Sequence, residues 1–183
     1  MRVRLTHIDG KLPNLALMKL AHWHRTRGNE VWFSRFPTRH DEDLPYDCVY
    51  ISSIFDWSSE LVKQAEQTFP RSVSGGTGTS NWHTVEQLLG ESQYEHYDYS
   101  IYPEYQWSIG FTQRGCRLQC KFCVVPQKEG KPESINTLWD IWRPGTAKNI
   151  HLLDNDFFGQ PAEEWKARLA EAREGDFRLC FNQ

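Results

Sequence analysis

The chain has 183 residues, a net charge of −3 at pH 7, and ordinary shares of hydrophobic (39%) and charged (25%) residues. Such a composition fits one large or two small soluble domains, and it lacks the overall basic charge that marks nucleic-acid binding. No apolar run approaches the length of a membrane-spanning helix, and the N-terminus starts as a strand without the apolar region of a signal peptide. Three of the five cysteines lie in one short segment, which favours a reducing compartment and predicts a cytoplasmic protein.

The first 80 residues alternate between strand and helix patterns. The apolar spacing predicts elements in the order β-α-β-β-α-β, at residues 2–8, 13–27, 30–34, 47–55, 58–68 and 72–74. Pro13 suits the first turn of the first helix, and Gly28 suits its end. This order predicts a small doubly wound, Rossmann-like α/β domain over residues 1–80.

The last strand of this domain ends in the sequence Gly-Gly-Thr-Gly at residues 75–78. These residues do not make a full dinucleotide-binding fingerprint, so a plain sharp turn is favoured over a ligand cradle. A linker is expected at 81–104, where four tyrosines form an aromatic face. Packing between two domains is the favoured role of these tyrosines, with substrate stacking as the alternative.

Residues 105–183 predict a second α/β domain. Its elements are expected in the order β-α-β-α-β, with strands at 106–111, 149–154 and 177–181 and helices at 134–142 and 161–173. The first of these helices is expected to begin at an N-cap formed by Ser134 and to stop at Pro144.

The first strand of this domain leads, through Gly115, to Cys116, Cys120 and Cys123 in a C-x3-C-x2-C pattern. Structural zinc sites and simple electron-transfer clusters use four protein ligands, so three thiols leave one position of a metal centre open. Five basic neighbours favour the ligating thiolate form: Arg114, Arg117, Lys121, Lys128 and Lys131. The pattern therefore predicts a metal site in a loop that follows a strand.

With Phe122 as the aromatic residue of C-x3-C-x-aromatic-C, this segment resembles the signature of the radical S-adenosylmethionine (radical SAM) enzymes. The resemblance implies that Cys116, Cys120 and Cys123 hold a 4Fe–4S cluster whose open iron binds SAM. It also implies that an electron from the cluster cleaves SAM into methionine and a 5′-deoxyadenosyl radical, with Phe122 beside the adenine. A reductant protein such as a flavodoxin or ferredoxin is then the expected partner.

The element order of 105–183 matches the opening half of the partial (β/α)6, TIM-like barrel of that family. Such barrels carry their chemistry at the carboxyl ends of the strands. By position, Asp154 and Asp156 are therefore candidates to bind the methionine end of SAM, although the family often has a G-G-E-type motif there. The alternative is that they form a turn and favour the next helix N-terminus. Because the chain stops after the third barrel strand, we expect a truncated protein or a half completed by another subunit.

Residues 1–80 also resemble the cobalamin-binding-type domain that precedes the radical SAM domain in one branch of the family. The Gly-Gly turn at 75–78 matches that resemblance. The cobalamin-ligating pattern D-x-H-x-x-G is absent, because His7 and Asp9 occur in the wrong order. The sequence therefore does not predict cobalamin bound through a histidine.

The resemblance leaves the substrate and the outcome of the reaction open, including methyltransferase and methylthiotransferase types. Two other functions compete with the enzyme. In the first, the three cysteines and a histidine such as His151 hold structural zinc, and the basic loop meets RNA. In the second, the chain binds a cluster without turning over SAM.

Overall fold

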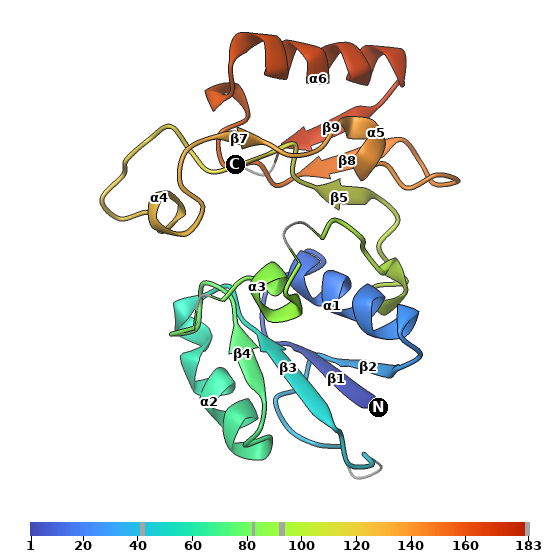
Figure 1. Cartoon of the computed structure of the whole chain (residues 1–183), viewed down its shortest axis with the longest axis vertical. Helices are drawn as coiled ribbons and strands as arrows, with labels where there is room; N and C mark the ends of the chain where they lie inside the picture. Colours follow the sequence, from blue (N-terminus) through green and yellow to red (C-terminus); the bar gives the residue numbers. More distant parts are fainter. Residues whose placement is uncertain (41–42, 82, 92–93, 182–183) are drawn as a thin grey trace. The chain divides into compact units, whose positions relative to one another are not determined.

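The computed structural model describes residues 1–40, 43–81, 83–91 and 94–181 of the chain. Its residues group into two compact units, Met1–Pro103 and Glu104–Gln183 (Figure 1). Both units mix helices with a parallel sheet, so the expected α/β class is confirmed. Within the described ranges, no helix is both long and apolar enough to cross a membrane.

The first unit is built on a four-stranded parallel sheet with the strand order β2-β1-β3-β4. Its strands are β1 (Arg2–His7), β2 (Glu30–Ser34), β3 (Cys48–Ser52) and β4 (Val73–Gly75). Helix α1 (Leu15–Thr26) joins β1 to β2, whereas α2 (Ser59–Thr68), preceded by the 3-10 turn η1 (Asp56–Ser58), joins β3 to β4. The central pair β1 and β3 is therefore flanked by β2 on one side and by β4 on the other.

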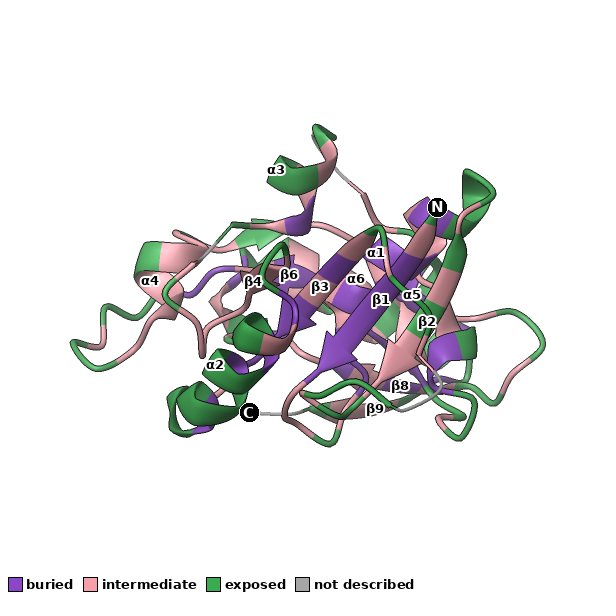
Figure 2. Cartoon of the chain, turned by 90° about the horizontal axis from the view of Figure 1, so that it is seen from below, coloured by how far each residue is buried: buried purple, intermediate pink, exposed green. Residues whose placement is uncertain are grey.

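The two faces of this sheet are covered by different helices. Val49 and Ile51 pack against Ala65 and Phe69 at α2, while the hydroxyl of Tyr50 lies 3.1 Å from His24 Nε2 on α1. Because neighbouring strand residues point to opposite faces, α1 and α2 cover opposite sides of the sheet. The buried residues concentrate on the central strands β1 and β3, and the edge strand β2 is more exposed (Figure 2).

Helix α1 begins two residues later than its proline suggests. Asn14 is the N-cap, and its side-chain oxygen accepts a hydrogen bond of 3.1 Å from Leu17 N. The side-chain nitrogen of Asn14, Nδ2, also donates to Ser52 Oγ at 2.8 Å. A cap satisfies a helix N–H that otherwise has no partner, so Asn14 rather than Pro13 fixes the start of α1.

Apart from Glu104, the described part of the expected linker at 81–104 belongs to the first unit. It contains helix α3 (Val85–Leu89) and the 3-10 turn η2 (Tyr99–Ile101). Lys19 of α1 forms ion pairs with Glu86 at 2.7 Å and Glu95 at 2.5 Å. These contacts tie the segment to α1.

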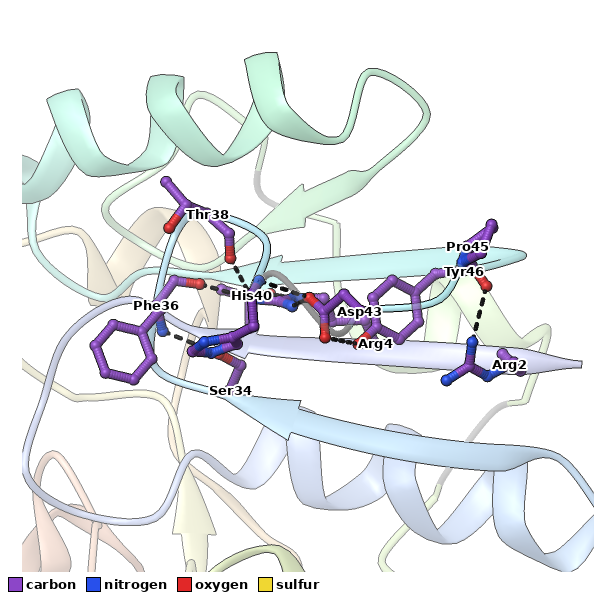
Figure 3. A network of polar contacts seen from close by, with 10 residues as sticks. Arg2, Arg4, Ser34, Phe36, Thr38, His40, Asp43, Pro45 and Tyr46 are labelled. Carbon is purple, nitrogen blue, oxygen red and sulfur yellow. Dashed lines mark hydrogen bonds and ion pairs between the residues drawn. The ribbon is translucent and has the colours of Figure 1, made fainter.

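The β2–β3 connection is the only crossover of this sheet without a helix among the described residues, and a buried arginine binds it (Figure 3). Arg4, in the middle of β1, is 1% exposed. Its Nη1 donates to Asp43 Oδ2 at 2.6 Å, and its Nη2 donates to the carbonyl oxygens of Phe36 and Thr38, both at 2.9 Å. The Arg4 fork therefore holds the connection in place of a packed helix.

The second unit contains a three-stranded parallel sheet with the order β5-β8-β9. Its strands are β5 (Ser108–Gly110), β8 (Asn149–Leu152) and β9 (Arg178–Phe181). Helices α5 (Leu138–Ile141) and α6 (Ala162–Glu174) pack on the same face, around Ile150 and Leu152. The unit also has the short hairpin β6 (Gln113–Arg114) and β7 (Glu133–Ser134), helix α4 (Val125–Lys128) and the 3-10 turn η3 (Phe157–Gly159).

The expected helix at 134–142 is wrong in its first half. Ser134 is not an N-cap, because it pairs with Gln113 in the β6–β7 hairpin. The cap is Thr137, whose hydroxyl oxygen accepts from Asp140 N at 3.1 Å, while Asp140 accepts in return from Thr137 N at 2.9 Å. This reciprocal capping starts the helix at Leu138.

Replacing Arg4 with methionine tests whether its hydrogen bonds stabilise the β2–β3 connection. We expect Arg4→Met to lower the free energy of unfolding by about 3–5 kcal/mol, because it leaves the Asp43 carboxylate and two carbonyls without their buried partner. Urea unfolding of the purified chain measures this change. The exposed Arg71→Met is the matched control, expected within about 0.5 kcal/mol of the parent. Equal stability of the two variants would contradict this stabilising role of Arg4.

Candidate functional site

The three cysteines lie in the loop of the β6–β7 hairpin. This segment, residues 115–130, is here called the cysteine loop. Its two ends meet where Cys116 N donates to Gly130 O at 3.2 Å. Gly115 has a φ of +80°, and a Cβ on it would lie 2.2 Å from the backbone oxygen of Lys131. Only glycine fits this crossing, which explains the Gly115 that precedes the pattern.

The three thiols differ in their surroundings. Cys116 is 9% exposed, and its sulfur accepts from Leu118 N at 3.4 Å. Cys120 and Cys123 are partly exposed and flank a turn, in which Cys123 N donates to Cys120 O at 3.0 Å. Phe122 is 94% exposed at the tip of this turn. Cys116 is thus held at the base of the loop, while the other two thiols lie further out.

The donor set fits an iron–sulfur cluster in kind, since three soft thiolates follow one another within eight residues of one loop. In the described parts of the chain, however, no group of three or more His, Cys, Asp or Glu side chains is gathered as a metal site. The three sulfurs would therefore have to draw together around a bound cluster.

Two of the five basic residues around the loop form ion pairs with carboxylates. Arg114 Nη2 lies 3.5 Å from Glu129 Oε1, and Arg117 Nε lies 3.1 Å from Asp156 Oδ2. Burial lowers the pKa of Lys128. Lys121 remains exposed on the outer part of the loop. The loop is therefore less strongly basic than its sequence suggests.

Asp154 lies just past the end of β8 and is 1% exposed. Its carboxylate accepts from Thr112 N at 2.7 Å, Thr112 Oγ1 at 2.5 Å and Gln113 N at 3.1 Å. Burial raises the pKa of Asp154, and these hydrogen bonds work against that rise. Its two oxygens thus bind the backbone that follows β5.

Asp156 lies nearer to the cysteines than Asp154 does. Its Oδ2 accepts from Arg117 N at 3.4 Å and is 3.9 Å from Cys116 Sγ. The backbone oxygen of Asp156 accepts from Gln113 Nε2 at 2.5 Å. Of the two expected carboxylates, Asp156 therefore lies at Cys116, whereas Asp154 binds the backbone that leads into the loop.

Sequence reasoning missed a buried polar group at the same strand ends. Thr112, Gln113 and Gln160 are all at most 5% exposed. Gln160 Nε2 donates to Phe157 O at 3.1 Å, and Gln113 Oε1 has no hydrogen-bond partner among the described residues. The signal was a run of polar residues directly after an apolar strand, where a buried turn needs hydrogen bonds.

The side chain of His151 contacts residues outside the cysteine loop. It points away from the helix-covered face of β8, because its neighbours Ile150 and Leu152 face α5 and α6. Its Nδ1 lies 3.2 Å from the Tyr105 hydroxyl, and its Nε2 lies 4.0 Å from Cys180 Sγ. Both ring nitrogens thus face partners on this side of the sheet.

In the first unit, Asp9 occupies the backbone donors at the carboxyl end of β3. It accepts from Ile54 N at 2.7 Å, Ser53 Oγ at 2.7 Å and Phe55 N at 3.2 Å. A Cβ on Gly76 would lie 2.2 Å from the backbone oxygen of Ser53. The Gly-Gly turn therefore needs glycine for close packing against the chain itself.

His7, at the end of β1, is fully buried. The Tyr102 hydroxyl accepts from Asn14 N at 3.2 Å and lies 3.0 Å from His7 Nδ1, so it donates to that nitrogen. The ring proton then belongs on Nε2, which has no partner in the described part of the chain. Burial, with a smaller contribution from the charge of Arg35, lowers the pKa of His7 from 6.5 to about 4.

No protein-family model matches the chain, and a search of curated proteins also finds no match.

The depressed pKa of His7 predicts a pH dependence of stability. A histidine that is neutral when folded stabilises fully above its unfolded pKa of 6.5 and loses that contribution as the pH falls toward about 4. At about 1.4 kcal/mol per pKa unit, the loss is on the order of 3 kcal/mol. Urea unfolding between pH 7 and 4.5 should show a smaller decline for His7→Gln than for the parent.

The comparison isolates His7, because the carboxylates and the other histidines titrate in both proteins. Glutamine keeps an oxygen that can accept from the Tyr102 hydroxyl. Parallel stability curves for the two proteins would show that His7 is not the responsible group.

Proposed function

We propose that the chain is a radical SAM iron–sulfur protein in which Cys116, Cys120 and Cys123 hold a 4Fe–4S cluster. The observation that carries the proposal is the C-x3-C-x2-C-bearing loop, which follows β5 at the carboxyl end of a parallel sheet. In α/β folds, chemistry is placed at that end of the strands. Bound there, the cluster supplies the electron that cleaves SAM into methionine and a 5′-deoxyadenosyl radical.

The finer fold assignment belongs to the same proposal. The strand order β5-β8-β9, with both helices on one face, supports the opening part of a (β/α)6 barrel in the second unit. The order β2-β1-β3-β4 supports a Rossmann-like, cobalamin-binding-type domain in the first unit. Asp9 and the Gly-Gly turn fill the carboxyl end of its β3 with the chain's own groups, which argues against cobalamin there.

The chain's own residues suit the proposed ligands in distinct ways. The exposed ring of Phe122 offers a flat apolar surface to an adenine. The Asp156 carboxylate lies beside Cys116, and its contacts with Arg117 and Cys116 run through Oδ2, so Oδ1 is an acceptor that suits the ammonium group of SAM. The buried Gln113 Oε1, which has no partner among the described residues, is a second such acceptor. Asp154 suits that role less well, because backbone and hydroxyl donors already occupy its oxygens.

The zinc hypothesis needs a fourth ligand beside the three cysteines. His151 was its candidate, but both its ring nitrogens face Tyr105 and Cys180. The contacts of His151 therefore favour the three-thiol cluster over a zinc site.

Anaerobic reconstitution tests the proposal. We expect the chain to bind about four iron atoms with sulfide, and the EPR spectrum of the reduced protein to change when SAM is added. Single Cys116→Ala, Cys120→Ala and Cys123→Ala variants should each lose most of this iron, because every one removes a ligand. Iron and zinc analysis with EPR measures these outcomes.

The matched control is Cys180→Ala, which removes a thiol from β9 and should keep the iron. Stoichiometric zinc without iron would contradict the radical SAM proposal and support the zinc-binding module. A cluster whose EPR signal is indifferent to SAM would leave a cluster-binding protein without SAM chemistry.

A further inference from the structure

We propose that the segment 154–156, here called the clasp, positions the cysteine loop through all three of its side chains. The inference rests on the proposed function, because it assigns these residues to the same ligand loop. Its members Asp154, Asn155 and Asp156 are then positioning residues. Three separate sets of contacts carry the proposal.

The first contact holds the chain that enters the loop. Asp154 accepts from the backbone nitrogens of Thr112 and Gln113, at 2.7 and 3.1 Å. Thr112 lies between β5 and the β6–β7 hairpin, and Gln113 is the first residue of β6. A buried carboxylate that accepts two backbone N–H groups fixes their direction, since leaving them unpaired would be costly. Asp154 therefore sets the path from β5 into the hairpin.

The second contact holds the point where the loop closes. Asn155 Nδ2 donates to Glu129 Oε2 at 2.9 Å, and the same oxygen accepts from Gly115 N at 3.1 Å. Glu129 lies near the end of the loop and Gly115 at its start. Asn155 is thus joined to both ends of the cysteine loop through one carboxylate.

The third contact reaches the first cysteine. Asp156 pairs with Arg117 at 3.1 Å and lies 3.9 Å from Cys116 Sγ. Arg117 Nη1 also donates to Phe158 O at 3.2 Å. Cys116 therefore lies between two anchored residues, Gly115 and Arg117.

These contacts divide the loop into a held part and an open part. The clasp holds residues 112–117 and Glu129, whereas Cys120 and Cys123 lie on a turn with the exposed Phe122. Cys116 is then the preset ligand, and the other two thiols close on it when a cluster binds. A ligand that is already in place lowers the entropic cost of ordering the loop when the cluster binds.

Thiol labelling of the cluster-free chain tests the clasp directly. We expect iodoacetamide to modify Cys116 about tenfold faster in Asp156→Asn than in the parent, because local opening of the held part becomes easier. The rates at Cys120 and Cys123 should stay unchanged. Peptide mass spectrometry measures each site, and Glu163→Gln, an exposed carboxylate on α6, is the matched control.

Two further variants guard against a general loss of folding. Asp156→Glu restores the carboxylate and should recover much of the protection of Cys116. Asn155→Ala should raise the labelling of Cys116 without removing any charge. Equal labelling of Cys116 in the parent, Asp156→Asn and Asn155→Ala would overturn the clasp.

Reconstituted protein supplies the second readout. Asp156→Asn should lower the iron content and change the EPR line shape, while Glu163→Gln should match the parent. If the parent takes up no iron, the proposed function fails, and the labelling rates still decide the clasp. If the iron content and spectrum of Asp156→Asn equal those of the parent, the clasp does not position the cluster ligands and the inference is overturned.

Discussion

Parallel strands leave backbone N–H groups without ladder partners just past their carboxyl ends, and both units meet this constraint with an aspartate. Asp9, after β1, accepts from Ile54 N and Phe55 N beyond the neighbouring β3. Asp154, after β8, accepts from Thr112 N and Gln113 N beyond the neighbouring β5. A charged acceptor is the strongest partner for such donors, and a buried donor without one is costly.

The same solution has different consequences in the two units. In the first, Asp9 and the Gly-Gly turn close the strand ends with the chain's own groups. In the second, Asp154 holds only the base of a hairpin, so the loop beyond it remains outside the packed core. The partly exposed Cys120 and Cys123 lie in that outer part. The arrangement leaves the second unit, rather than the first, with thiols available to a metal centre.

Periodicity predicted the strands of both sheets because apolar residues recur along them, as in β1 and β8. It failed at residues 134–137, because a two-residue strand carries no period and its partner Gln113 lies 21 residues away in sequence. The start of α1 depended likewise on Asn14, whose cap was outweighed by the more conspicuous Pro13. Local signals thus predict the elements, while their ends depend on contacts made in three dimensions.

The candidate site shows the same division. The cysteine spacing was visible in the sequence, because ligands on one loop are close along the chain. The roles of Asp154 and Asp156 were not, because they depend on backbone donors about 40 residues earlier. A sequence pattern can therefore propose metal ligands before it can identify the residues that would hold them in place. Where thiols are not gathered in advance, cluster binding and loop ordering are one event, and residues that anchor part of the loop affect the affinity for the cluster.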